Sequence, residues 1–283
     1  MTDTTNTGRS ARRRIFTIAA GLATAASVVL AGTAGADSAT AKPAKPDKPT
    51  IVIVHGAWTD ASSFTDVEKI LTKDGYPVLG FANPLRSLSG DSEHLSSFLA
   101  ARTTGPVVLV GHSYGGAVIS EAALSDPNVK SLVYVDAFVP VEGESLLDLL
   151  NSAGPVDPTR LFEMVPYPGA PEGDVDLYLK KDAFGPGFAN GLSKTEQASF
   201  YAKQRPITFS AVNEKASAAE AWKTLPSWYV AGTQDASIPL ALQLQMAERA
   251  GSTVTEVKAG HLAMVKEPKK VAKVIETAAA STK

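Results

Sequence analysis

The chain contains no cysteine. This absence excludes a disulfide framework, a thiolate nucleophile and a cysteine metal site. Neither sign of charge is in excess, since the formal net charge is −2 and the sequence pI is near 6.1. Proteins that hold nucleic acid electrostatically carry a basic excess, so we expect no nucleic-acid partner.

Residues 1–36 have the three-part order of an export signal. Arginines stand at Arg12, Arg13 and Arg14, an apolar run rich in small residues extends over 18–31, and small residues precede the predicted cleavage after Ala36. The apolar run is too short for a retained membrane span, so we expect no stable membrane anchor.

An arginine pair that is followed by one residue and Phe16 is typical of a twin-arginine signal, the bacterial route that exports folded proteins. We therefore expect an extracellular protein that meets the export machinery before cleavage, with an ordinary secretory signal as the alternative. Residues 37–49 combine three prolines with Lys and Ala, which favours an extended linker, and residues 50–283 form the predicted domain.

Short apolar runs alternate with helical patterns along the predicted domain. This alternation predicts an α/β fold with a mostly parallel, doubly wound sheet. The expected strands are 50–54, 78–81, 107–110, 132–135, 228–231 and 254–257. The expected helices are 64–73, 92–102, 114–124, 239–250 and 268–279.

One insertion, at about 140–226, interrupts this alternation. It is rich in proline, glycine and aromatic residues, and helical patterns occur at 145–151 and 194–203. We predict a mostly helical cap, inserted before the penultimate strand, that forms the roof of a pocket.

The predicted strand 107–110 leads directly into the motif Gly111-His112-Ser113-Tyr114-Gly115-Gly116. This is a G-x-S-x-G sequence in the strand-turn-helix context of a nucleophile elbow. A serine on so sharp a turn projects its hydroxyl into the pocket. The bare motif is common by chance in glycine-rich turns that bind nothing, but its context predicts Ser113 as a nucleophile.

A serine hydroxyl needs a base within hydrogen-bonding reach. The chain has four histidines, and we predict His261 as the base because it directly follows the last predicted strand. His55 and His112 flank glycines at strand ends, where packing or support of the site is expected. His94 lies in a predicted surface helix.

The base needs a carboxylate that orients the imidazole and stabilises the imidazolium. Asp235 follows the predicted strand 228–231 and is the favoured acid. Asp136, at the end of the strand 132–135, is the alternative; otherwise it caps a loop or lines the pocket.

Backbone amides are the expected oxyanion donors. The Tyr114 amide lies at the start of the elbow helix, and the loop after the first strand offers the amide of Ala57. Trp58 and Phe138 are candidates for substrate contacts, although an ordinary core position explains Trp58 nearly as well. Aromatic residues of the cap suggest an apolar or aromatic substrate group, although they equally suit the cap's own core; they are Phe162, Tyr167, Phe184 and Phe188.

These motifs resemble the branch of the α/β-hydrolases that holds small bacterial esterases, plant methyl esterases and plant hydroxynitrile lyases. The similarity covers residues 50–279 and implies a Ser-Asp-His triad in the chain order of that fold. The lyases usually place Thr where Gly56 stands and Lys where Leu262 stands, so both departures indicate hydrolysis. Dehalogenase and epoxide-hydrolase relatives place Asp at the elbow, where this chain has Ser113.

We therefore predict a serine hydrolase that cleaves small, largely apolar carboxylic esters without a cofactor or metal. Lactones and small amides are alternative substrates. A ligand-binding protein that retains the fold and a cofactor-free lyase or perhydrolase are the alternatives from other classes, because fold does not determine function. The sequence carries no prediction of oligomeric state.

Overall fold

The computed structural model describes residues 48–282, so the predicted export signal and nearly all of the linker lie outside the described residues. The main sheet contains all six predicted strands. They are parallel and hydrogen-bonded in the order β2-β1-β3-β4-β8-β9. Their bounds are Thr50–Val54 (β1), Val78–Phe81 (β2), Val107–His112 (β3), Val129–Val135 (β4), Ser227–Gly232 (β8) and Thr253–Val257 (β9).

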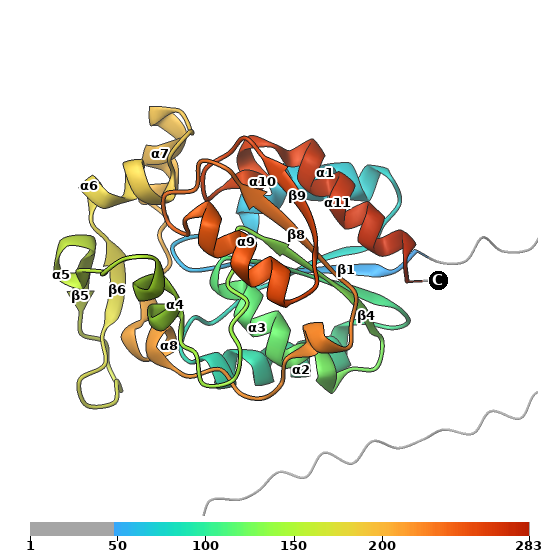
Figure 1. Ribbon diagram of the computed structural model, residues 1–283, viewed down its shortest axis with the longest axis horizontal. Helices are drawn as coiled ribbons and strands as arrows, with labels where there is room; N and C mark the ends of the chain where they lie inside the picture. Colours follow the sequence, from blue (N-terminus) through green and yellow to red (C-terminus); the bar gives the residue numbers. More distant parts are fainter. Residues whose placement is uncertain (1–47, 283) are drawn as a thin grey trace, which may run out of the picture. The chain divides into compact units, whose positions relative to one another are not determined.

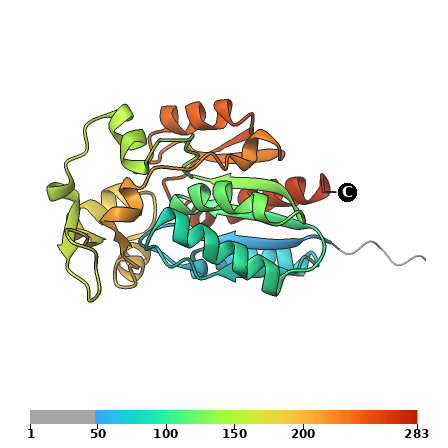
Figure 2. The same cartoon turned by 90° about the horizontal axis from the view of Figure 1, so that it is seen from below.

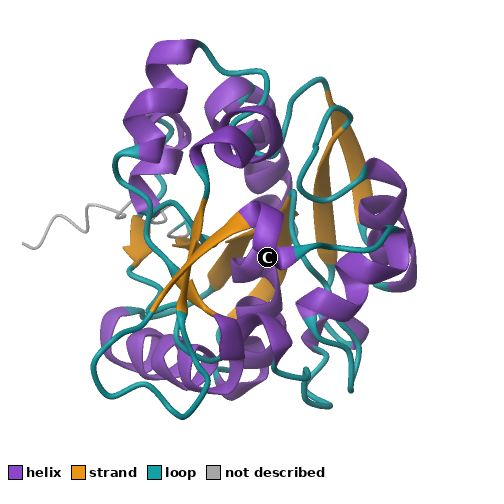
Figure 3. Ribbon diagram, turned by 90° about the vertical axis from the view of Figure 1, so that its left-hand side faces the viewer, coloured by secondary structure: helices purple, strands orange, loops and turns teal. Residues whose placement is uncertain are grey.

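Helices cover both faces of this sheet (Figure 3). On one face pack α1 (Thr65–Lys73), α10 (Ala263–Lys266) and α11 (Pro268–Ala280). On the other pack α2 (Leu88–Arg102), α3 (Tyr114–Ala122) and α9 (Leu240–Arg249). Short 3₁₀ turns complete the layers at Ala61–Phe64 (η1), Ala123–Ser125 (η2) and Ala221–Lys223 (η4).

The helices form where apolar residues recur at helical spacing. On α1, for example, Val67 and Leu71 are four residues apart and both are fully buried. Helix α2 begins at Leu88, four residues before the predicted start, because the side chain of Ser87 accepts a hydrogen bond from the Gly90 amide and caps the helix.

The strand order reverses between β1 and β3. The chain after β1 leads to α1 on one face, whereas β3 leads to α3 on the other. In parallel α/β sheets, ligands bind at such a switch point, outside the carboxyl ends of the strands. This edge is therefore the expected place for a site.

The cap departs from the main sheet after β4 and returns at β8 (Figures 1 and 2). The helices expected at 145–151 and 194–203 are present as α4 and α7, and each begins with a capping box. The helical elements are α4 (Leu146–Ala153), α5 (Pro158–Leu161), α6 (Lys181–Ala183), a π-helical turn η3 (Phe184–Phe188), α7 (Lys194–Tyr201) and α8 (Phe209–Asn213).

The cap also contains an antiparallel sheet that the sequence did not predict. Its strands are β5 (Phe162–Val165), β6 (Asp176–Leu179) and β7 (Ile207–Thr208), in that order. Helical elements still make up most of the cap's regular structure, as expected, and the small sheet is an addition to them. These strands are two to four residues long and β5 is an edge with Met164 exposed, so they lack the long apolar runs of the main sheet. Across residues 48–282, no helix has both the length and the apolar character of a bilayer span.

Candidate active site

Ser113 lies at the junction of β3 and α3 with φ 53° and ψ −124°, a conformation that non-glycine residues rarely adopt. The glycines around it have no room for side chains. A Cβ on Gly111 would lie 2.6 Å from the carbonyl oxygen of Gly115, and one on Gly116 would lie 2.5 Å from that of Phe138. The sequence therefore permits the close strand-helix contact that holds the serine on its turn.

The structure brings Ser113, His261 and Asp235 into one hydrogen-bonded chain. Nε2 of His261 lies 3.0 Å from Oγ of Ser113, and Nδ1 lies 2.8 Å from Oδ2 of Asp235. An ionised carboxylate only accepts hydrogen bonds, so Nδ1 carries the proton and Nε2 presents its lone pair to the serine. All three side chains are buried.

The carboxylate of Asp235 is held by three further donors. Its Oδ1 accepts from the amides of Ser237 at 2.7 Å and Ile238 at 2.9 Å, and its Oδ2 accepts from Nε2 of Gln243 at 2.9 Å. The fully buried Gln243 side chain, on α9, also donates to the Ile238 carbonyl at 2.8 Å. The sequence did not predict a role for Gln243. The available clue was its position one helical turn into α9, the helix that follows Asp235.

Asp136, the alternative acid, has different partners. Its carboxyl group accepts from the amides of Gly232 at 2.7 Å and Ala263 at 3.1 Å, and it makes no hydrogen bond to His261. Complete burial, together with the nearby charge of Asp235, raises the pKa of Asp136 well above its ordinary value. Asp136 therefore ties the end of β4 to β8 and to the loop that carries His261.

His112 also supports the loop that carries His261. Its Nε2 donates to the carbonyl oxygen of His261 at 2.9 Å, and the two rings lie 4.9 Å apart. Complete burial lowers the pKa of His112 well below its ordinary value, so the ring is neutral. The expectation of a supporting role for this residue matches its contacts.

The two predicted oxyanion donors both line the cavity, and their residues are buried. Neither the Ala57 nor the Tyr114 amide has a hydrogen-bond acceptor among residues 48–282. Buried amides normally have a partner, so both amides are candidate donors to a ligand oxygen. The Tyr114 phenol donates to Asp91 at 2.8 Å, so this side chain is committed to another contact.

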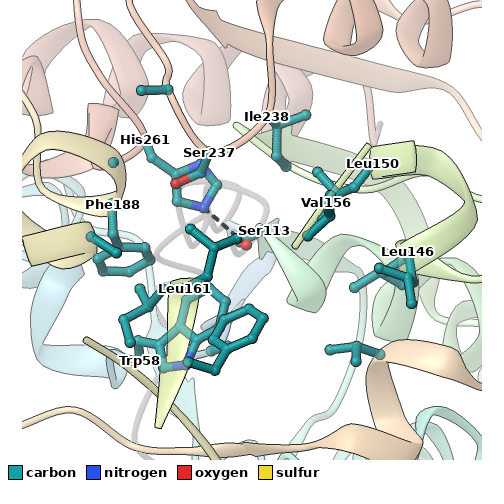
Figure 4. A pocket seen from close by; sticks show the side chains of 18 of the residues that line it. Trp58, Ser113, Leu146, Leu150, Val156, Leu161, Phe188, Ser237, Ile238 and His261 are labelled. Carbon is teal, nitrogen blue, oxygen red and sulfur yellow. Dashed lines mark hydrogen bonds between the residues drawn. The ribbon is translucent and has the colours of Figure 1, made fainter. Parts of the chain in front are cut away.

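A cavity of about 710 Å³ opens over Ser113 and His261. In Figure 4 the aromatic Trp58 and Phe188 lie on one side of Ser113, while aliphatic side chains lie on the other, namely Leu146, Leu150, Val156 and Ile238. Trp58 stacks on Phe162 at 5.6 Å between ring centroids and meets the edge of Phe188 at 5.6 Å. Phe138 also lines the cavity, as do three exposed charged residues, Asp157, Arg160 and Asp182.

Two of the cap aromatics do not line this cavity. Tyr167 donates to Asp174 at 2.7 Å, and the Arg86 guanidinium lies 5.1 Å from its ring. Phe184 is 1% exposed and packs within the cap against Tyr201, with 5.4 Å between the ring centroids.

In the part of the chain that the structure describes, no three His, Asp or Glu side chains form a metal-binding group.

Residues 51–274 match the model of the Alpha/beta hydrolase family. A "Carbendazim hydrolyzing esterase" from Nocardioides sp. (strain SG-4G) is 38% identical over 126 residues, which are 39% of this chain and 51% of that protein. A "Putative methylesterase 11, chloroplastic" from Arabidopsis thaliana is 30% identical over 215 residues, 69% of this chain and 54% of that protein. The matches thus span about half the length of these relatives.

The structure of polyneuridine aldehyde esterase superposes with a TM-score of 0.68 at 23% identity. This superposition covers 81% of the present chain and 98% of that one, so the two share their fold over most of their length.

Proposed function

The chain belongs to the alpha/beta hydrolase family, and we propose that it is a serine hydrolase that cleaves carboxylic esters of small, neutral, largely apolar substrates. The observation that carries this proposal is the hydrogen-bonded chain from Asp235 through His261 to Ser113. The esterase and methylesterase among the relatives support esters as the bond that is cleaved.

In the proposed mechanism, Oγ of Ser113 bonds to the ester carbonyl carbon while Nε2 of His261 takes the hydroxyl proton. The amides of Ala57 and Tyr114 donate to the oxyanion. Collapse of the tetrahedral intermediate breaks the bond to the alcohol oxygen, which takes the proton from His261 and leaves an acyl-Ser113. Water then attacks the acyl carbon and gives a proton to Nε2 of His261. Collapse of this second tetrahedral intermediate breaks the bond between the acyl carbon and Oγ of Ser113. Oγ takes the proton back from His261, and the acid departs.

The two amides supply the main stabilisation of developing charge, since losing one oxyanion donor typically costs about 2.7 to 4 kcal/mol. Asp235 contributes by holding the imidazole and stabilising the imidazolium. We assign Asp235 rather than Asp136 as the acid of the proposed triad because the His261 ring is hydrogen-bonded to Asp235 and not to Asp136.

The cavity supports a neutral substrate. Around Ser113 the walls are aromatic or aliphatic, whereas the charged lining residues, such as Arg160, are exposed. An apolar wall recognises hydrocarbon by burying it, and burial of an unpaired charge there would be costly. We therefore expect esters with uncharged acyl and alcohol groups.

We also propose that the protein is exported and acts outside the cell. The arginine-rich start, the apolar run and the small residues that end at Ala36 support this, because together they have the order of a signal peptide. The arginine pair supports the twin-arginine route.

The test is release of nitrophenol from short and medium acyl esters by residues 37–283, compared with Ser113→Ala. Activity lost in this variant and retained in Ser62→Ala, which removes an exposed hydroxyl of η1, is the expected result. A hemisuccinate ester should be cleaved far more slowly than a neutral ester of equal length. Absence of turnover in the folded wild-type domain would instead favour a ligand-binding protein.

A further inference from the structure

His55 follows β1 and is fully buried, yet it is outside the hydrogen-bonded chain of the proposed triad. Its Nε2 lies 3.1 Å from the backbone nitrogen of Asn83, and its Nδ1 lies 2.9 Å from the carbonyl oxygen of Gly56. A backbone N–H only donates, so Nε2 is the acceptor and Nδ1 carries the proton. The ring therefore donates to the Gly56 carbonyl.

The Gly56 carbonyl and the Ala57 N–H belong to one peptide unit. A trans peptide is planar and its C=O and N–H point in opposite directions, so a partner that fixes the carbonyl also fixes the direction of the amide. The Ala57 amide has no acceptor among residues 48–282, and Ala57 lines the cavity with Ser113.

This peptide lies directly against the nucleophile. A Cβ on Gly56 would lie 2.6 Å from Cβ of Ser113 and 3.2 Å from its Oγ. Glycine meets that spatial requirement but leaves the backbone unusually free to rotate. A separate restraint on the peptide is needed, and the imidazole of His55 provides one.

We propose that His55 is a positioning residue of the oxyanion hole, which fixes the Gly56–Ala57 peptide so that the Ala57 amide faces the substrate oxygen. The proposal rests on the ester hydrolysis proposed above. Asn83 holds the ring in turn, since its side chain also donates to the His55 carbonyl at 3.0 Å. Donors that are oriented before the reaction need no reorganisation when charge develops, which is how an oxyanion hole lowers the barrier.

Two substitutions at His55 separate this role from simple packing. In His55→Asn, the amide nitrogen takes the place of Nδ1 and keeps a donor for the Gly56 carbonyl, but does not reach Asn83. In His55→Gln, the longer amide reaches towards Asn83 and leaves no donor beside that carbonyl. We expect His55→Gln to lower kcat about 10-fold or more with KM nearly unchanged, and His55→Asn to retain most of kcat.

The second readout is the affinity for an aryl trifluoromethyl ketone, whose adduct with Ser113 carries an oxyanion. It should fall in His55→Gln by the same factor as kcat/KM. His94→Gln, which changes an exposed histidine of α2, is the control and should behave as wild type. Equal losses of kcat in the Asn and Gln variants, or wild-type kcat in His55→Gln, would overturn the proposal.

A measurement on the unaltered protein covers the case in which a variant does not fold. Nitrogen-15 NMR of the His55 ring should show the Nδ1–H tautomer, and the Nε2–H tautomer would overturn the proposal. An inactive wild-type domain would refute the ester hydrolysis itself, which is distinct from an active domain in which His55 makes no difference.

Discussion

Asp235 and Asp136 are both buried carboxyl groups at the carboxyl edge of the sheet, but their partners differ. Asp235 accepts from the His261 ring and from three other donors, whereas Asp136, among residues 48–282, accepts only from two backbone amides. Residue type and position along the strands made both of them candidates in the sequence. The choice between them depends on hydrogen bonds between the ends of different strands, and a sequence does not show these bonds.

Because the two carboxyl groups have different partners, we expect the Asp→Asn substitution to affect kcat and stability differently at the two positions. Asp235→Asn should lower kcat by roughly 10⁴-fold, because an amide stabilises the wrong imidazole tautomer. Asp136→Asn should lower kcat far less, but should reduce the free energy of unfolding by about 1–3 kcal/mol, since its NH₂ group faces a backbone donor. Ester turnover and urea unfolding of both variants measure these effects. A larger loss of kcat in Asp136→Asn would exchange the two roles.

The burial of His55 predicts how the free energy of unfolding depends on pH. Burial is the largest cause that lowers the pKa of His55 to about 4 from an ordinary 6.5, and the hydrogen bond to Gly56 offsets it only in part. The unfolded chain therefore binds this proton at a higher pH than the folded chain. Its contribution is present above pH 6.5 and is lost as the pH falls towards 4, by about 3 kcal/mol in total.

Urea unfolding of wild type and His55→Asn between pH 7 and pH 4 measures this contribution, because the carboxylates titrate in both proteins and cancel in the comparison. The wild type should lose more stability than the variant across this interval. Parallel pH profiles would contradict the assigned burial and neutrality of His55.

At the scale of elements, the cap contacts both loops that carry the acid and the base. Nδ2 of Asn190, just after η3, donates to the carbonyl oxygen of Gln234 at 2.5 Å. A Cβ on Gly260 would lie 2.6 Å from Cγ of Asn190, so the loop before His261 packs directly on this residue. Phe188 of η3 meets the His261 ring at 5.3 Å.

Loosening this contact should affect turnover. We expect Asn190→Ala to lower kcat about 10-fold, because small displacements of catalytic groups are costly. Asn213→Ala is the matched control and should leave kcat unchanged, because in the described part of the chain this amide bonds within α8 alone. Kinetics of both variants at equal folded concentration measure this effect. Equal kcat values would show that the cap does not help to hold the two loops.

The elements themselves were mostly predictable. The six strands of the main sheet are short runs rich in β-branched and other apolar residues, and β1 and β2 begin and end at the predicted residues. The sheet of the cap was not predictable, because β7 has two residues and takes its partner β6 from far along the chain. For the same reason, His112 and Gln243 showed no partners in the sequence: their contacts depend on how the loops meet.

At the scale of the whole molecule, the proposed site combines segments that the sequence keeps far apart. Ala57 follows β1, Ser113 follows β3, Asp235 follows β8 and His261 follows β9. Parallel strands bring their carboxyl ends to one edge, so the fold places all four residues at the same edge of the sheet. Ala57 and Ser113 flank the point where the strand order reverses. The insertion between β4 and β8 forms the cap over the cavity, and β4 and β8 remain neighbours in the main sheet.

The export proposal also belongs to this scale. Changing Arg13 and Arg14 together to lysine should stop secretion and leave the uncleaved chain in the cytoplasm, because the twin-arginine route depends on the arginine pair. Fractionation of a twin-arginine-competent bacterial host measures this outcome. Secretion that persists in the variant and stops on inhibition of the general secretory pathway would point to an ordinary signal.

The most direct test of the central claim is covalent labelling of the nucleophile. After incubation of residues 37–283 with a fluorophosphonate and proteolysis, mass spectrometry should find one phosphonyl group, on the peptide that contains Ser113, with loss of ester turnover in proportion. Asp235→Asn should be labelled much more slowly. An unlabelled Ser113 in a folded protein that still cleaves esters, or a label on another residue, would contradict the account.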